Sequence, residues 1–399
     1  MSAVTSLRGR VAAIGGVIVL ILVAGVWVVL THTAAQGSDT ADKPGAHPSG
    51  RVTTAPLQLV SETPVSGATG VNGATGITLN FSAPVAPDSP MPTISPSAAG
   101  SWDGAGTSTL QFVPAVGFAP SSQVAVEVPG GPHGVRSASG GLLGSSVQLS
   151  FQTGSYQGAR LVELLAQLGY LPLTWTAAPD ATVPAPTDAL GQLAAAYDPP
   201  AGSYTWQQGY PTTLQSFWGG GAATGLIVQG AVMAFESEQG LTMDGVAGPQ
   251  VWSALLKAVA AGQDNQNGYT YAIANEGNPE TLTIWHDGQQ VLQVLANTGI
   301  EAAPTTLGTA PVYLRLRNQI MKGTNPDGTP YADPVQYVAY FRSGEAVHYF
   351  PRGSYGWPQS LGCVELNLSD AAQAWPYLTY GSLVTVLAGS LTPPGSPTA

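Results

Sequence analysis

Residues 11–30 form an uninterrupted apolar run, VAAIGGVIVLILVAGVWVVL, without a charged side chain. A helix of this length spans about 30 Å, the thickness of the hydrocarbon core of a bilayer. Arg8 and Arg10 precede the run, and the next basic residue is Lys43. Because basic residues stay on the cytoplasmic side of a span, the run predicts a single-pass transmembrane anchor. Residues 1–10 would be a cytoplasmic tail, and the rest of the chain would lie outside the cytoplasm.

A cleaved signal peptide is the alternative interpretation of the same run. The run is longer than the usual core of a signal peptide, and the THTAAQ that follows is only a weak cleavage site. No cysteine follows the run directly, so a lipoprotein anchor is excluded. Both interpretations predict an exported protein.

The composition suits an exported chain rich in β-structure. Among 399 residues there are 50 Gly and 33 Pro, and only 9% of the residues are charged. The 12 Lys and Arg against 23 Asp and Glu give a net charge of −11. No basic run follows residue 10, so we do not expect nucleic acid as a partner. Short apolar stretches separated by turn residues predict several modules joined by linkers.

Patterning divides the exported part into regions and predicts a multidomain, mainly β protein with a small α domain. Residues 31–54 are a Ser/Thr/Gly/Pro-rich linker. Residues 55–154 contain short alternating strands such as GITLNFS and SVQLSFQTG. This pattern predicts a β-sandwich and resembles bacterial Ig-like domains. Residues 155–265 switch to helical spacing. Residues 268–389 return to strands, with hairpin turns expected at Asp287-Gly288 and near Ser343-Gly344 and a short helix expected to begin at Asp370. Residues 390–399 are a Pro/Ser/Thr tail.

The helical region resembles a peptidoglycan-binding repeat, a small three-helix module. LVELLAQLGYLP matches the first half of the repeat, and FESEQGLTMDGVAGPQVWSAL matches the second. Pro249 after Gly248 marks the expected start of its last helix. The connection between the halves, about 174–224, is much longer than is usual for that family. A helical spacer derived from such a module is therefore the alternative to glycan binding.

Cys363 is the only cysteine of the chain. Exported proteins usually pair cysteines in disulfides, and a single cysteine can form neither an intrachain disulfide nor a thiolate-rich metal site. An inert buried thiol and a nucleophile are the two remaining interpretations. A nucleophile needs a base and backbone N–H groups that stabilise an oxyanion. Gly362, directly before the cysteine, would let a second backbone approach closely.

His348 is the histidine best placed to be that base, because it ends a predicted strand 15 positions before Cys363. The other histidines lie in the linker, in a turn of the Ig-like region or beside a hairpin turn: His32, His47, His133 and His286.

The segment HYFPRGSYGWPQSLGCVEL resembles the signature of the L,D-transpeptidase catalytic domain. That signature is a histidine, a loop of a dozen or more residues, then Ser/Thr-His-Gly-Cys and a hydrophobic residue. The upstream NTGIEAAPTTLGTAPVYLR resembles the substrate-side strand of the same domain. The order of Ig-like, helical and catalytic regions is similar to that of actinobacterial members, which cross-link the cell wall.

The resemblance implies acyl transfer without a metal or organic cofactor. Cys363 would be the nucleophile, His348 the general base and acid, and the N–H groups of Leu361, Gly362 and Cys363 the oxyanion hole. The thiolate would attack the carbonyl between diaminopimelate and the terminal D-Ala of a tetrapeptide stem, and the acyl group would pass to the side-chain amine of a second stem. The implied partners are donor and acceptor stems, carbapenem-type inhibitors and the cytoplasmic membrane, and the implied location is the cell membrane and cell wall.

Five further residues are expected by position to contact substrate, with packing inside the loop as the alternative for the aromatic ones: Tyr331, Tyr349, Arg352, Trp357 and Ser360. The sequence departs from the signature at three points. Leu361 replaces the histidine before Gly-Cys, Glu365 replaces an Arg or Asn, and the loop from His348 to Ser360 holds only 11 residues. An inactive wall-binding or adhesion protein and a cysteine peptidase that transfers the acyl group to water therefore stay open.

Overall fold

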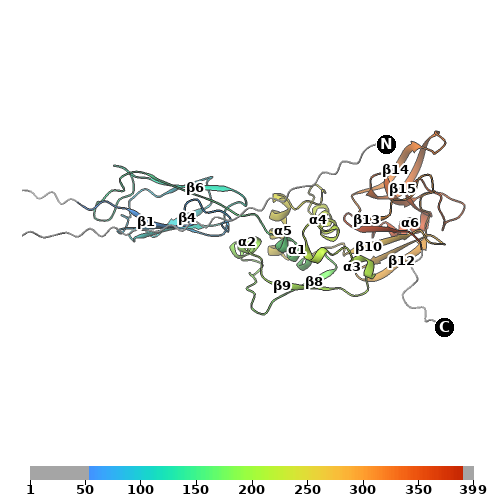
Figure 1. Cartoon of the computed structure of the whole chain (residues 1–399), viewed down its shortest axis with the longest axis horizontal. Helices are drawn as coiled ribbons and strands as arrows, with labels where there is room; N and C mark the ends of the chain where they lie inside the picture. Colours follow the sequence, from blue (N-terminus) through green and yellow to red (C-terminus); the bar gives the residue numbers. More distant parts are fainter. Residues whose placement is uncertain (1–53, 390–399) are drawn as a thin grey trace, which may run out of the picture. The chain divides into compact units, whose positions relative to one another are not determined.

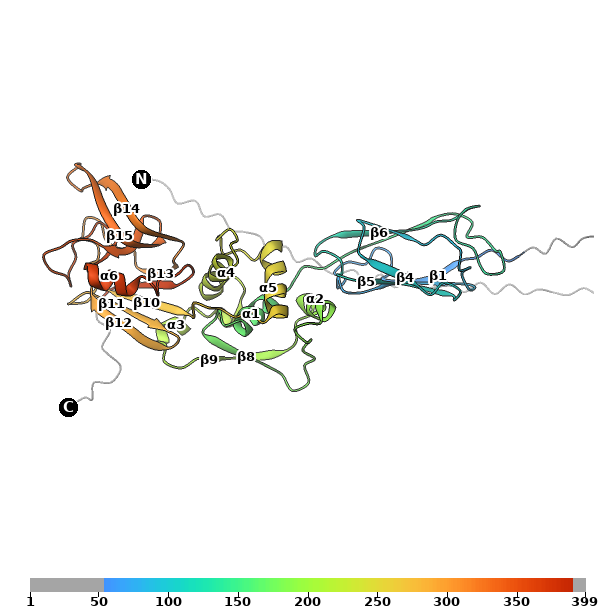
Figure 2. The same cartoon turned by 180° about the vertical axis from the view of Figure 1, so that it is seen from behind.

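The structure is a computed structural model that describes residues 54–389 (Figures 1 and 2). The predicted cytoplasmic tail, anchor or signal, most of the linker and the C-terminal tail lie outside the described residues. Within residues 54–389, no helix is long and apolar enough to cross a bilayer.

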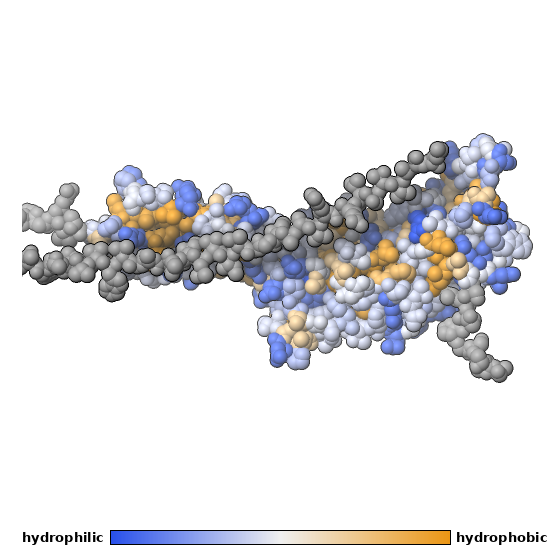
Figure 3. All heavy atoms as spheres, in the orientation of Figure 1, coloured by the Kyte–Doolittle hydropathy of each residue, from blue (hydrophilic) through white to orange (hydrophobic). Residues whose placement is uncertain are grey.

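The Ig-like region forms two antiparallel sheets, ordered β1-β2-β5-β4 and β3-β6-β7 (Figure 1). Its strands are β1 Leu59–Thr63, β2 Ile77–Phe81, β3 Thr93–Ser95, β4 Gly100–Asp103, β5 Thr109–Pro114, β6 Gln123–Val128 and β7 Val147–Gln152. Alternate residues of β2 and β6 are buried, and a single core cluster takes side chains from both sheets. The predicted β-sandwich is therefore confirmed. Figure 3 shows apolar surface on this domain, where Val60 and Val113 are among the exposed large side chains.

The helical region contains more elements than its sequence pattern predicts. They are α1 Gly158–Gln167, β8 Leu173–Ala177, α2 Ala189–Tyr197, β9 Gly202–Trp206, α3 Thr212–Gln215, the 3-10 helix η1 Gly219–Gly221, α4 Leu226–Glu238 and α5 Pro249–Ala261. The helices expected from apolar spacing correspond to α1, α4 and α5, and Pro249 is the first residue of α5. The long connection between the two halves of the repeat folds into α2 and the β8–β9 hairpin.

The C-terminal region consists of two sheets, ordered β12-β11-β10-β18-β13 and β14-β15-β16-β17. Its elements are β10 Thr270–Asn275, β11 Thr281–His286, β12 Gln289–Leu295, β13 Gly308–Pro311, β14 Leu314–Thr324, β15 Pro330–Arg342, β16 Glu345–Tyr349, β17 Val364–Leu366, α6 Leu368–Ala374 and β18 Leu383–Leu387. The expected hairpin turns occur at Asp287-Gly288, where φ is 46° and 76°, and at Gly344, where φ is 79°. Buried residues of both sheets and of α6 form one core cluster.

The helix expected to begin at Asp370 begins two residues earlier, at Leu368. Asn367 precedes it, and its side-chain oxygen accepts a hydrogen bond of 2.9 Å from the N–H of Asp370. Asn367 therefore caps the first turn, and Asp370 contributes its negative charge inside that turn.

The helical region and the C-terminal sheet share one hydrophobic core. Tyr271, Ile273 and Leu383 of the sheet belong to the same buried cluster as apolar residues of α1, α4 and α5. The contact is close at Gly230 of α4, because a Cβ built there would lie 2.5 Å from the carbonyl oxygen of Gly381. The boundary predicted near residue 265 therefore separates two pieces of chain that fold against each other.

Candidate active site

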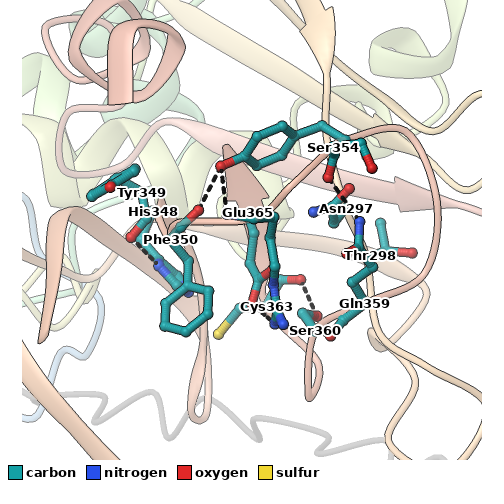
Figure 4. Close-up of polar contacts among 12 residues, drawn as sticks. Asn297, Thr298, His348, Tyr349, Phe350, Ser354, Gln359, Ser360, Cys363 and Glu365 are labelled. Carbon is teal, nitrogen blue, oxygen red and sulfur yellow. Dashed lines mark hydrogen bonds and ion pairs between the residues drawn. The ribbon is translucent and has the colours of Figure 1, made fainter. Parts of the chain in front are cut away.

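Strands β16 and β17 place the predicted base and nucleophile on the same face of one sheet. The strands run parallel, and His348 pairs with Glu365. Cys363 lies two residues before Glu365, and residues two apart along an extended chain point to the same face. His348 and Cys363 both line a pocket of about 400 Å³. Figure 4 shows the sulfur of Cys363 directed toward the side on which His348 and Phe350 lie.

His348 is held as a neutral imidazole. Its side chain is buried, and its Nδ1 lies 2.9 Å from the backbone oxygen of Tyr349 (Figure 4). A carbonyl can only accept, so Nδ1 carries the proton and Nε2 keeps its lone pair. Burial lowers the pKa of His348 below its usual 6.5, although the contact with Tyr349 opposes that shift. The imidazole is therefore available as a base at neutral pH.

The thiol of Cys363 is protonated in the resting site. Burial raises its pKa to about 12, and the negative charges of Glu365 and Glu345 add to the increase. The sulfur contacts the backbone oxygen of Gly344 at 3.7 Å. Among the described residues, no hydrogen bond joins this sulfur to His348. Formation of a thiolate therefore depends on proton transfer when a substrate arrives.

Ser360 fixes the turn that carries the nucleophile. Its hydroxyl donates to the backbone oxygen of Cys363 at 2.6 Å and accepts from the N–H of Gly362 at 3.1 Å. Gly362 has a φ of +107°, which disfavours any residue with a Cβ. Because the N–H of Gly362 is used inside the turn, the candidate oxyanion donors are the N–H groups of Leu361 and Cys363. Neither donates a hydrogen bond within the part of the chain that the structure describes.

The turn is also joined to the segment after β12. The N–H groups of Gln359 and Ser360 donate to the backbone oxygen of Thr298 at 2.9 and 3.0 Å. Thr298 in turn donates its N–H and its hydroxyl to the buried carboxylate of Glu280 at 2.6 and 2.7 Å. These bonds connect the nucleophile turn to the buried centre of the domain.

Glu365, the second departure from the signature, forms an ion pair with Arg352. The guanidinium donates from Nε and Nη2 to the two carboxylate oxygens at 2.7 and 2.8 Å. Nη2 also donates to the backbone oxygen of Gln359 at 2.9 Å, and the guanidinium carbon lies 4.6 Å from the ring centre of Phe350. This bidentate geometry compensates the buried charge of Glu365 beside the nucleophile.

The structure divides the residues expected to contact substrate into two sets. Tyr331 and Arg352 line the pocket together with His348, Leu361 and Cys363. The remaining three do not. Tyr349 packs against the domain core, Ser360 lies fully buried under its turn, and Trp357 is 51% exposed. For these three, the structure favours packing or surface roles.

The β14–β15 hairpin contributes most of the pocket residues that the sequence analysis missed. They are Gln319, Met321, Lys322, Asn325, Asp333, Val335 and Tyr340, joined by Gly344, Phe350, Gln359 and Glu365. The sequence signal for this pocket wall was the pair of long alternating strands on either side of the turn near residue 327. Within residues 54–389, no three His, Cys, Asp or Glu side chains are grouped as metal ligands would be.

Two family models match the chain in the regions where the structure places the sandwich and the pocket. The L,D-transpeptidase catalytic domain matches residues 269–386, and the bacterial Ig-like domain matches residues 52–153. These matches show that the chain carries an L,D-transpeptidase catalytic domain that follows a bacterial Ig-like domain in the sequence.

Solved structures similar to the chain include three L,D-transpeptidases. One from Mycobacterium smegmatis is 16% identical, covers 83% of this chain and 99% of its own, and has a TM-score of 0.28. L,D-transpeptidase 3 from Mycobacterium tuberculosis, with a faropenem-derived adduct, is 15% identical, covers 82% and 97%, and has a TM-score of 0.28. The catalytic domain from E. faecium is 27% identical, covers 29% and 95%, and has a TM-score of 0.27. A search of the curated proteins found no match.

Proposed function

We propose that the protein cross-links peptidoglycan through a thioester on Cys363. The observation that carries this proposal is the pairing of a thiol with a neutral imidazole whose Nε2 is unprotonated, in one pocket of an L,D-transpeptidase catalytic domain. The donor is a tetrapeptide stem ending in D-Ala, and the acceptor is the side-chain amine of a diaminopimelate in a second stem.

In the first half-reaction, Cys363 Sγ attacks the carbonyl carbon between diaminopimelate and D-Ala while His348 Nε2 takes the thiol proton. The carbonyl oxygen becomes an oxyanion, for which the N–H groups of Leu361 and Cys363 are the candidate donors. When the tetrahedral intermediate collapses, the C–N bond breaks and His348 returns the proton to the leaving D-Ala. The products are a thioester and free D-Ala.

In the second half-reaction, the neutral amine of the acceptor stem attacks the thioester carbon. His348 takes a proton from the attacking nitrogen, the C–S bond breaks, and the proton passes to the departing sulfur. The result is an amide between two diaminopimelate residues and a regenerated thiol. The high pKa of Cys363 makes proton transfer to His348 during the attack essential, because few molecules hold a preformed thiolate at neutral pH.

We also propose that residues 11–30 anchor the protein in the cytoplasmic membrane, with the linker placing the catalytic domain in the cell wall. The uncharged run and the basic residues before it support this proposal.

Acylation by a carbapenem tests the enzymatic proposal. Residues 55–399 should gain the mass of one carbapenem, peptide mapping should place it on Cys363, and Cys363→Ser should remain unmodified. A carbapenem acylates a nucleophilic thiol as a donor stem does, but the resulting adduct breaks down slowly. An unmodified intact mass, under conditions that label an established L,D-transpeptidase, would contradict the proposal.

Two alternatives remain to be separated from it. The raised pKa of Cys363 favours an inactive wall-binding protein, which would show no adduct. A cysteine peptidase would show the adduct but convert a tetrapeptide donor to tripeptide only, even with acceptor amine present. Mass spectrometry of the products of a donor and acceptor mixture distinguishes the three functions.

A further inference from the structure

The inner face of the β14–β15 hairpin forms one wall of the pocket. Met321 pairs with Asp333 and Gly323 pairs with Tyr331 in the antiparallel register of the hairpin. Side chains of directly paired residues lie on the same face of a sheet. Met321, Tyr331 and Asp333 all line the pocket that contains Cys363. Asp333 therefore presents a carboxylate on the pocket wall that the hairpin forms.

Asp333 is the pocket carboxylate that lacks a protein partner. It is half-buried and makes no ion pair or side-chain hydrogen bond within residues 54–389. Glu365, the other carboxylate of the pocket, is compensated by the bidentate contact with Arg352. Lys322 also lines this pocket, but it is exposed and forms no ion pair with Asp333 within residues 54–389.

The charge of Asp333 acts on two other residues that line the pocket, Tyr331 and Arg352. Burial raises the pKa of Tyr331, and the charges of Cys363 and Asp333 raise it further. The hydrogen bond with Glu365 raises the pKa of Arg352, and the charge of Asp333 contributes to that increase. Asp333 therefore shares its pocket and its electrostatic environment with residues that line the same cavity as Cys363.

We propose that Asp333 binds the side-chain ammonium of the acceptor stem and thereby selects cationic amines as acceptors. This inference rests on the proposed transpeptidase function. A primary alkyl amine has a pKa of about 10.4, so the acceptor arrives as a cation at neutral pH. A carboxylate without a protein partner in a half-buried pocket forms a strong charge-assisted hydrogen bond with such a group.

The proton balance of the step is closed. The bound ammonium releases one proton to solvent and becomes a neutral amine beside the thioester. Its nitrogen then forms the new C–N bond and gives a second proton to His348, which passes it to the departing sulfur of Cys363. Thioester and ammonium are thus converted to amide, thiol and one released proton, with Asp333 unchanged.

The test separates recognition of charge from the chemistry of aminolysis. The full exported chain is acylated with a tetrapeptide donor, and aminolysis is followed with Nα-acetyl-lysine amide and with hydroxylamine, which is uncharged at neutral pH. For Asp333→Asn, kcat/KM for the lysine derivative should fall about tenfold, mainly through KM, because a charge-assisted contact is lost. The rates with hydroxylamine, with water and with a carbapenem should stay within about twofold of wild type. Asp333→Glu should restore most of the loss.

Glu301→Gln is the matched control, because Glu301 is an exposed carboxylate of the same domain that does not line the pocket. It should leave all four rates unchanged. An equal loss for the charged and uncharged nucleophiles in Asp333→Asn, or no loss for either, would overturn the inference. A second test uses the wild-type enzyme and an analogue of the lysine derivative whose side chain ends in an uncharged acyl hydrazide in place of the amine. If the wild-type enzyme showed no preference for the lysine derivative over this analogue, the inference would also be overturned. Absence of acylation in wild type would instead overturn the proposed function.

Discussion

His348 and Cys363 are shifted toward their neutral forms, the opposite of a preformed thiolate–imidazolium pair. Burial lowers the pKa of His348 and raises that of Cys363 to about 12. Both groups have been moved away from water, which penalises their charged states. The thiol is therefore stable between reactions, and its nucleophilicity appears only when the proton is transferred.

This arrangement predicts a particular pH dependence. Acylation of Cys363 by a carbapenem should be nearly constant at neutral and mildly alkaline pH, where His348 is unprotonated. It should fall as the pH drops below the lowered pKa of His348, because the imidazolium cannot accept a proton. In His348→Ala, the rate at neutral pH should fall by about 10² to 10⁴ and should rise with pH, since only direct ionisation of the thiol remains. Stopped-flow or mass-resolved acylation rates across the pH range measure both profiles.

His286→Ala is the control for loss of an imidazole elsewhere in the domain. His286 lies beside the β11–β12 turn and its Nδ1 contacts the hydroxyl of Thr270 at 3.0 Å. Its removal should leave the acylation profile unchanged. If His348→Ala acylated at the wild-type rate at neutral pH, another group would have to be the base.

Arg352 carries the next prediction at the scale of single residues. Arg352→Ala leaves the carboxylate of Glu365, a buried residue, without its partner, and should lower the free energy of unfolding by about 3 kcal/mol. The double variant Arg352→Ala/Glu365→Gln should recover part of the loss, because the uncompensated charge is gone. Urea denaturation of the three proteins measures the difference. If the double variant were no more stable than Arg352→Ala, loss of packing against Phe350 would be the main effect.

At the scale of elements, the nucleophile turn depends on the hydroxyl of Ser360. Ser360→Ala removes the acceptor for Gly362 N–H and the donor to Cys363 O, and it leaves both groups buried. The expected cost is about 1 to 3 kcal/mol of stability, with a slower acylation because the turn loses its fixed geometry. Thermal denaturation and carbapenem acylation of the same samples measure the two effects. Ser369→Ala, on the exposed side of α6, should change neither.

The strands and helices of the fold could be predicted where one face of an element is buried. Alternation identified the sandwich strands and the hairpins at Asp287-Gly288 and Gly344, and apolar spacing identified α1, α4 and α5. The segment of α2 and the β8–β9 hairpin was not predicted, because its Trp and Tyr residues only partly bury against the helices and give no clear period. Tertiary contacts, rather than local pattern, decide its structure.

The sequence predicted the reacting residues of the candidate site, but not most of the residues that form the walls of its pocket. Spacing and residue type singled out Cys363 and His348, and the structure brings both to one pocket. The directions of Trp357 and Ser360 depend on the backbone of an irregular loop, which sequence does not determine. Tyr349 is the last residue of β16, next to His348 in the strand, and neighbours in a strand point to opposite faces. The contribution of the hairpin depends on which face of two long strands turns inward, and this is set by the register with β16.

At the scale of the molecule, the separation of cores predicts which fragments survive. The Ig-like region has a core cluster of its own, whereas the helical region shares one with Tyr271, Ile273 and Leu383. A fragment of residues 155–399 should therefore fold and be acylated at Cys363. A fragment of residues 268–399 should expose those three side chains and lose cooperative unfolding. Circular dichroism melting and carbapenem labelling test both fragments.

The outcome for the longer fragment also tests the role of the Ig-like domain. If residues 155–399 remained folded but were no longer acylated, the Ig-like domain would help to form the active site. The proposal that it acts as a spacer would then be wrong.

The close approach of Gly230 and Gly381 has a consequence for how such chains can be recombined. The two residues come from segments about 150 positions apart in sequence. A Cβ at either position would clash with the backbone oxygen of the other residue. Gene fusions that exchange the transpeptidase segment alone would join surfaces that were not selected to match. A fusion that works must therefore transfer α1, α4 and α5 together with the catalytic sheet. The segment that has to be inherited as one piece is larger than the segment that contains Cys363 and His348.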